Sequence, residues 1–301
     1  MDIQRQHLKS VVFLCIEQTD DDGKAYNQPV STGFVVNFPD PLHNCSWNYL
    51  VTVRHCIEEV PGSQIVVRVN TTDVYRDFAT DQGDWFTHDS ADVATLLFTP
   101  PTDAMFEAIP FSVLIRNYTV AAPPEVPKDS IIRQHAEMGA FKVRIGHEVF
   151  FTGLFAESAG KQRNLPIVRF GHIARMPEER ITFKTRARGE IDLAVYLAEC
   201  RSWGGHSGSP AYWYNEVKSS DLIRADGKEY TAVVGQYYMI GLLGLVTGHF
   251  AIPEKGRSDD AGIEIETRLN AGIAMITPAD EIAALLMRDD LQEDRQDRIK
   301  Q

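Results

Sequence analysis

Cysteine is scarce in this sequence. Four cysteines are spread through 301 residues, and no two of them have the C-x-x-C spacing. This usage does not suggest a zinc site and is too sparse for a disulfide scaffold, so we expect reduced thiols. No H-E-x-x-H motif and no G-x-x-x-x-G-K-[ST] loop is present. We therefore expect no metal and no cofactor.

Long apolar runs and an excess of positive charge are also absent. The most apolar run, Met239–Val246, is far shorter than the roughly 20 residues of a membrane helix. With 30 Lys and Arg against 42 Asp and Glu, the net charge of −12 repels phosphate backbones. The first residues lack a signal-peptide core and cleavage site. We therefore expect a cytoplasmic protein that binds neither nucleic acid nor membrane.

What the sequence does contain is a series of short β-branched and aromatic runs. Hydrophobic residues make up 44% and charged residues 24%, which is typical of globular chains. The runs before the middle of the chain predict strands at 10–16, 33–36, 49–53, 65–69 and 93–98. Later runs predict strands at 148–152, 166–170, 191–196, 211–214, 242–247 and 272–276. Strands this short, separated by turn residues, favour a sandwich or barrel.

The segments between and after these runs have a different composition. Proline-rich residues 101–140 indicate a connector with a short helix near 130–138, and 215–229 and 254–268 are expected to be surface loops. Thr277 and Pro278 predict a helix cap, followed by an apolar face. Beyond Arg288 we expect a charged tail, solvated or forming a frayed helix. The resulting units are 1–100, 101–140, 141–276 and 277–301.

Three segments combine the residue types that acyl transfer needs. In chain order they are Leu50–Cys56 with His55 at a strand end, Ala91–Leu97 with Asp92 at a strand start, and Gly204–Pro210 with Ser207 in a glycine-rich turn. A serine hydroxyl needs a neighbouring base, histidine has an ordinary pKa of about 6.5, and a buried carboxylate fixes the histidine tautomer. Glycines let backbone N–H groups face an oxyanion.

These segments resemble motifs of the trypsin/chymotrypsin-like serine peptidases. Residues 51–56, V-T-V-R-H-C, are similar to T-A-A-H-C, and residues 92–97 are similar to D-I-A-L-L. Residues 205–210, G-H-S-G-S-P, are similar to G-D-S-G-G-P in the G-x-S-G-S-P form of bacterial glutamyl-endopeptidase-like members. The resemblance covers roughly residues 10–287.

The resemblance implies an all-β fold of two antiparallel, chymotrypsin-like β-barrels followed by a C-terminal helix. Residues 1–100 would form the barrel carrying His55 and Asp92, and 141–276 the barrel carrying Ser207. His55 would be the general base, Asp92 would orient it, and Ser207 would be the nucleophile. The backbone N–H groups of Gly205 and Ser207 would form the oxyanion hole.

Two departures from the family pattern affect expectations. Cys56 has no partner cysteine near residues 31–32, so the family's disulfide is not expected. His206 occupies the position where digestive members carry an aspartate that pairs with a newly released N-terminal amine. We therefore expect activity without an N-terminal cleavage.

Substrate preference rests on the same resemblance. Thr247 and His249 lie where glutamyl-endopeptidase-like members bind an acidic side chain. Arg201 falls near the pocket base, and Gly272 falls in the pocket wall. An acidic preference is one interpretation; the other is that Arg201 points to solvent and His249 is a packed strand residue.

The leading functional hypothesis is a serine endopeptidase that hydrolyses polypeptides through an acyl-enzyme. One alternative is a catalytically retired peptidase fold used as a binding module, and another is a serine esterase or acyltransferase. An α/β-hydrolase is disfavoured because its chain order is Ser, Asp, His. An unregulated peptidase would endanger a cell, which favours a narrow specificity or a regulatory protein partner.

Overall fold

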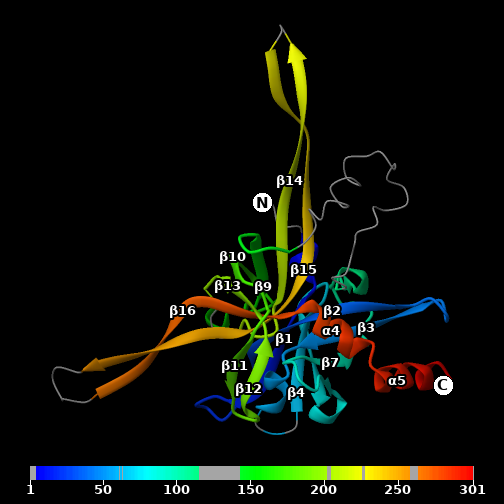
Figure 1. Ribbon diagram of the computed structural model, residues 1–301. Coiled ribbons are helices and arrows are strands. Elements are labelled where there is room, and N and C mark those ends of the chain that lie inside the picture. Colours follow the sequence, from blue (N-terminus) through cyan, green and yellow to red (C-terminus); the bar gives the residue numbers. More distant parts are fainter. Residues whose placement is uncertain are drawn as a thin grey trace.

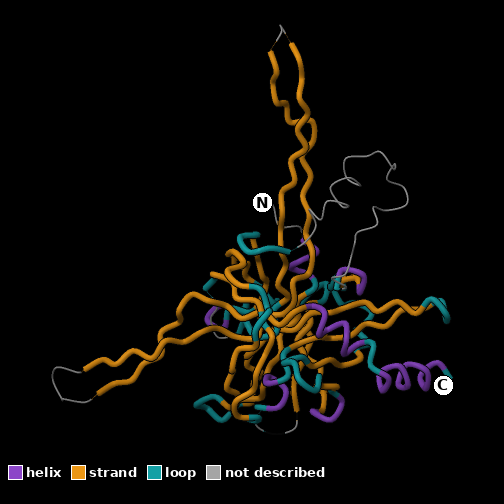
Figure 2. Tube along the Cα trace, in the orientation of Figure 1, coloured by secondary structure: helices purple, strands orange, loops and turns teal. Residues whose placement is uncertain are grey.

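The computed structural model describes residues 5–60, 62, 64–114, 143–201, 205–225, 228–257 and 264–300, with the backbone alone for 217–239 and 251–270. Strands dominate these residues, and the helices are short (Figures 1 and 2). Most of the predicted connector, including the helix expected near 130–138, lies outside the described residues.

The first half of the chain forms one sheet. Its strands are β1 (Val11–Thr19), β2 (Ala25–Asp40), β3 (Cys45–Thr52), β4 (Gln64–Asn70), β5 (Tyr75–Asp81), β6 (Phe86–Thr87), β7 (Ala94–Leu97) and β8 (Ile109–Pro110). The eight-stranded sheet has the order β5-β4-β1-β2-β3-β7-β6, and β8 pairs with β2 in parallel. The helical segments here are α1 (Arg5–Lys9), α2 (His55–Glu58), η1 (Gln82–Asp84) and η2 (Phe111–Val113).

This first sheet has two buried faces. In β1, Val12 and Leu14 pack with residues of β4 and β7 in one core. The alternate residues Val11 and Phe13 pack instead against Leu154 of the second half. Within the described residues the hydrogen-bonded order does not close into a ring, so this unit is a sheet around a shared core. The alternation explains why β1 has an unbroken apolar run: both of its faces are covered.

The second half of the chain contains a closed antiparallel barrel with the order β10-β13-β16-β15-β14-β9. The elements of this half of the chain are β9 (Glu148–Gly153), η3 (Ala156–Ser158), β10 (Ile167–Arg175), β11 (Arg180–Thr185), β12 (Gly189–Ala194), β13 (Tyr196–Glu199), β14 (Pro210–Ala225), β15 (Lys228–Arg257) and β16 (Glu264–Pro278). β11 and β12 form a separate two-stranded sheet. The prediction of an all-β fold with a terminal helix is confirmed, with one closed barrel and a second sheet where the resemblance implied two barrels.

Two expected surface loops are instead parts of long strands. The ladder between β14 and β15 continues from Asn215–Met239 out to Ala225–Lys228, and that between β15 and β16 extends to Arg257–Glu264. Figure 1 shows both pairs as ribbons that project far from the barrel. The polar composition predicted loops wrongly, because neighbouring strands can satisfy each other's backbone groups whatever the polarity of the side chains.

The chain ends in two helices, α4 (Ala279–Leu286) and α5 (Asp289–Ile299). The predicted apolar face of α4 is buried and packs against both halves of the molecule. Pro278, not Thr277, is the N-cap residue, and the Thr277 hydroxyl is hydrogen-bonded to that of Thr247 at 2.5 Å. No helix among the described residues is long and apolar enough to cross a membrane.

Candidate functional site

His55 lies just after the end of β3 in the first half of the molecule, and its ring faces Phe183 of β11 in the second half. Strand β3 ends at Thr52, and the single-turn helix α2 begins at His55 itself. Arg54 holds this turn in place: its Nε binds Glu58 at 2.6 Å and its Nη1 donates to the carbonyl of His88 at 2.6 Å. The loop that precedes Asp92 is thereby tied to the helix that carries His55.

Asp92 makes two hydrogen bonds with His55. Its Oδ2 lies 2.7 Å from His55 Nδ1, and its Oδ1 accepts the backbone N–H of His55 at 2.9 Å. The carboxyl side chain is 1% exposed and the imidazole 16% exposed. Because an ionised carboxylate only accepts hydrogen bonds, the proton lies on Nδ1 and Nε2 is left as the basic nitrogen.

Opposing influences act on the pKa of His55. Burial lowers it, because burial disfavours the charged imidazolium. The neighbouring Cys56 and the Asp92 carboxylate raise it, and they prevail, so the pKa of His55 lies well above 6.5. The pair therefore stabilises a protonated imidazole, which is the form that a general base reaches after it accepts a proton.

Ser207 lies in a tight turn before β14. Gly205 and Gly208, on either side of it, have φ values of +95° and +84°, a backbone region that favours glycine. The turn closes with a hydrogen bond from Ser209 N to His206 O at 2.9 Å. Gly208 N donates to Val246 O at 2.8 Å, which fixes the turn against β15.

Thr32 of β2 connects this turn to the first sheet. Its N–H donates to Ser207 O at 2.9 Å, and its hydroxyl donates to Gly205 O at 2.7 Å. Its carbonyl accepts the hydroxyl of Thr52 at 2.7 Å, three residues before His55. Thr32 is fully buried and positions the serine turn relative to the histidine strand. No chemical signal in the residue pattern pointed to Thr32, since a threonine in a strand is ordinary.

The Ser207 hydroxyl has one described hydrogen bond, to Thr247 O at 3.4 Å. Among the described residues no hydrogen bond joins it to His55. The structure thus brings His55 and Asp92 into direct contact and holds the Ser207 backbone against the sheet that carries them. Nucleophile–base hydrogen bonds are commonly loose without substrate. The catalytic roles of these residues and of the Gly205 and Ser207 amides stay predictions.

His206 has a different environment from a surface turn residue. It is fully buried, and its ring meets that of Phe151 edge to face with centroids 5.3 Å apart. An aromatic contact in the barrel core therefore stands where the digestive family members place an aspartate. The expected independence from N-terminal cleavage stays a prediction.

The residues expected to set specificity fall in different surroundings. Thr247 is buried beside Ser207, whereas Arg201 is exposed. His249 is half-buried, and burial lowers its pKa. Gly272 has φ +77° and accepts the N–H of Cys200 at 2.8 Å. The structure therefore places Thr247 next to the nucleophile but gives Arg201 an exposed position.

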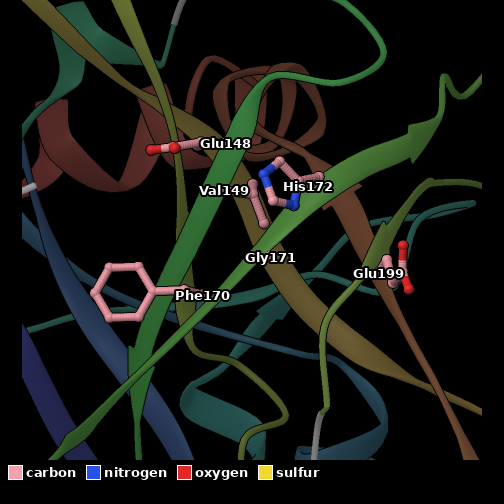
Figure 3. Close-up of a pocket in the computed structure, with 6 residues that line it drawn as sticks. All are labelled: Glu148, Val149, Phe170, Gly171, His172 and Glu199. Atoms are coloured by element: carbon pink, nitrogen blue, oxygen red, sulfur yellow. The ribbon is translucent and has the colours of Figure 1, made fainter.

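A separate hollow of about 570 Å³ lies on the closed barrel, and none of the predicted triad residues lines it. Figure 3 shows Glu148 and Glu199 on either side of His172, from three adjacent strands. No group of three or more His, Cys, Asp or Glu suited to a metal ion occurs in the described part of the chain. All four cysteines are free.

No family model and no curated protein matches this chain. Among solved structures, the active form of the Rv3671c protease from M. tuberculosis is 16% identical with a TM-score of 0.42, covering 94% of this chain and 81% of that one. Human heparin binding protein is 8% identical with a TM-score of 0.44, covering 95% and 93%. At these values the likenesses assign no activity and no residue role to this chain.

Proposed function

We propose that this protein is a serine endopeptidase acting on polypeptides through a Ser207–His55–Asp92 triad. The observation that carries the proposal is the His55–Asp92 pair, with a buried carboxylate 2.7 Å from Nδ1 and a second bond to the backbone N–H. A histidine held by two hydrogen bonds, together with a serine in a tight glycine-rich turn, is the arrangement that nucleophilic catalysis requires.

In the proposed reaction, Ser207 Oγ attacks the carbonyl carbon of the scissile peptide bond while His55 Nε2 takes the hydroxyl proton. The backbone N–H groups of Gly205 and Ser207 bind the oxyanion of the tetrahedral intermediate. His55 then gives its proton to the leaving amine, and the acyl group stays on Ser207 as an ester. Water, deprotonated by His55, hydrolyses that ester and restores the free serine.

The fixed position of the serine turn supports this reaction. Thr32 binds the carbonyl oxygens of Gly205 and Ser207, which fixes the peptide planes that follow these two residues. The plane carrying the Ser207 N–H lies between these two fixed planes, and the plane carrying the Gly205 N–H lies next to one of them. Donors that are already oriented stabilise a developing charge without reorganisation.

An acidic substrate preference is a finer part of the proposal. It rests on His249 and Thr247, which lie on the strand beside Ser207. Burial lowers the pKa of His249, so it would meet an acidic side chain as a neutral hydrogen-bond donor. Hydrolysis after Arg, Lys or large aromatic residues would reject this preference and leave the endopeptidase proposal intact.

One observation favours the retired binding module as a second candidate. The Ser207 hydroxyl is bound to the carbonyl of Thr247 rather than to His55. A hydroxyl held in that way is not activated by the base. The two candidates differ in whether Ser207 becomes acylated.

The test is hydrolysis of a peptide library by wild type, Ser207→Ala, His55→Ala and Asp92→Asn. We expect the first two variants to lose at least about 10⁴-fold in kcat and Asp92→Asn to keep a small residual rate. Ser209→Ala is the matched control, since its buried hydroxyl has no partner among the described residues. Cleavage by Ser207→Ala at the wild-type rate would refute the assignment, and hydrolysis of ester substrates alone would indicate an esterase.

A further inference from the structure

The β11–β12 hairpin has one apolar face and one polar face. Along β11, Ile181 and Phe183 are partly buried, while the alternate residues Arg180, Thr182 and Lys184 are exposed. Across the hairpin, Ile181 pairs with Leu193 and Phe183 pairs with Ile191. This face packs on Met275 and other apolar residues of the closed barrel. The base of the hairpin is thus fixed to the barrel that carries Ser207.

The tip of the hairpin reaches the other half of the molecule. The backbone N–H groups of Arg186 and Ala187 donate to the carboxylate of Glu59, the residue that follows α2. Arg188 Nη2 donates to the carbonyl of Asp89 at 3.2 Å. The segments bound by the tip are those that carry His55 and Asp92, so the hairpin bridges the two halves beside the site.

Phe183 of the hairpin lies against His55. Its ring centroid lies 5.9 Å from that of His55, with the ring planes tilted by 57°. The same ring also lies close to Gly248 of β15, where an added Cβ would lie 3.3 Å from it. Gly248 follows Thr247, whose carbonyl accepts the Ser207 hydroxyl. The ring is therefore close both to the base and to the strand beside the nucleophile.

We propose that the hairpin forms one wall of the substrate cleft and that Phe183 determines specificity, restricting the subsite beside His55 to small apolar side chains of a peptide. The inference rests on the proposed function. A carbonyl in reach of Ser207 places a neighbouring substrate side chain against His55. Two rings 5.9 Å apart are in contact range and leave no room between them, so that side chain must lie alongside both rings.

Peptide libraries varied on both sides of the scissile bond test this inference. In wild type, we expect Ala or Val to be preferred over Leu or Phe at one position next to the bond. In Phe183→Ala, that selectivity should fall at least about tenfold in kcat/KM, because the pocket deepens by a whole ring. Phe183→Trp should sharpen it. Lys184→Ala, an exposed neighbour on the same strand, is the control and should leave the selectivity unchanged.

The same libraries should be measured for binding to these variants in a Ser207→Ala background. A changed binding preference without hydrolysis in wild type would reject the proposed function and retain the cleft wall. Hydrolysis or binding with the same preference in wild type, Phe183→Ala and Phe183→Trp would overturn the role of Phe183. Circular dichroism establishes that each variant is folded, and Phe183→Leu replaces Phe183→Ala if the latter is not.

Discussion

At the scale of single residues, the site depends on how one imidazole is held. Asp92 binds both the ring and the backbone N–H of His55, so the ring can neither rotate freely nor exchange tautomers without losing a short hydrogen bond. Cys56 and Asp92 together outweigh the effect of burial on the pKa of His55. The protonation state of this residue therefore links the geometry of the site to pH.

The raised pKa of His55 predicts the pH dependence of activity. A general base acts in its neutral form, so kcat/KM should rise with pH through a midpoint above 6.5. Stability depends on pH in the opposite direction. The protonated His55–Asp92 pair contributes to the free energy of unfolding fully below the unfolded-state pKa of His55, and this contribution is lost as pH rises through the folded-state pKa of His55. A pH–rate profile, together with thermal unfolding across the same range, measures both.

Asp92→Asn provides the comparison for this prediction. Removing the carboxylate takes away one of the influences that raise the pKa, so an NMR titration of His55 should show a lower midpoint in the variant than in wild type. A wild-type midpoint at or below 6.5, or equal midpoints in the two proteins, would contradict the account.

Residue order predicted part of this site and missed the rest. The His–Asp–Ser order indicated which side chains to bring together, and the structure places His55 and Asp92 in contact. Thr32 and Glu59 were not foreseen. Their partners, Gly205 and the Arg186–Ala187 turn, lie far away in the chain, so neither periodicity nor local composition records these contacts.

At the scale of elements, the serine turn depends on the absence of side chains at its glycines. A Cβ at Gly208 would lie 2.0 Å from Thr32 O and 2.4 Å from Thr52 Oγ1. Both neighbours belong to the strands that connect the turn to His55, so a shift that relieves the clash changes the position of the serine turn relative to the strands that lead to His55.

Gly208→Ala should therefore lower both stability and activity. The left-handed backbone alone costs about 1–2 kcal/mol for alanine, and the clash with a backbone oxygen adds to this. Gly189→Ala is the matched control: its φ is +69° and nothing lies within 4 Å of the added Cβ. Urea unfolding and kcat/KM compare the two, and an equal loss in both variants would show that the contacts with Thr32 and Thr52 are unimportant.

The positions of the strands were easier to predict than their lengths. The apolar centres of β9, β14 and β16 correspond to predicted runs, because the closed barrel buries them. The strand predicted at 191–196 instead spans the end of β12 and the first residue of β13. The ends of β14, β15 and β16 leave the barrel as two-stranded ribbons, where hydrogen bonds between neighbours replace burial. Composition reports burial well but carries little information on such pairing.

At the scale of the whole molecule, the C-terminal helices join the two halves. Leu291 of α5 is fully buried in the same core as Tyr49 of the first sheet and Leu245 of the barrel. Arg295 donates to the Tyr49 hydroxyl at 2.9 Å and stacks over the Phe38 ring at 4.4 Å. The charged end of the chain is thus a helix docked on the first sheet through Leu291 and Arg295.

Leu291→Ala should destabilise the protein as a core substitution does. The free energy of unfolding should fall by about 2–5 kcal/mol, because a cavity replaces a fully buried side chain. Leu42, which is 90% exposed, provides the control, and Leu42→Ala should change stability by no more than about 0.5 kcal/mol. Guanidinium unfolding distinguishes them, and a loss as small as that of Leu42→Ala would mean that α5 does not dock through Leu291.

The central claim is that Ser207 is a nucleophile activated by His55. Labelling with a fluorophosphonate, followed by mass spectrometry of the modified peptide, tests it most directly, since this reagent traps an activated serine. The account predicts one adduct, on Ser207, that is lost in His55→Ala and kept in Ser209→Ala. A folded wild-type protein that stays unlabelled, or labelling of Ser207 that is as fast in His55→Ala as in wild type, would contradict it.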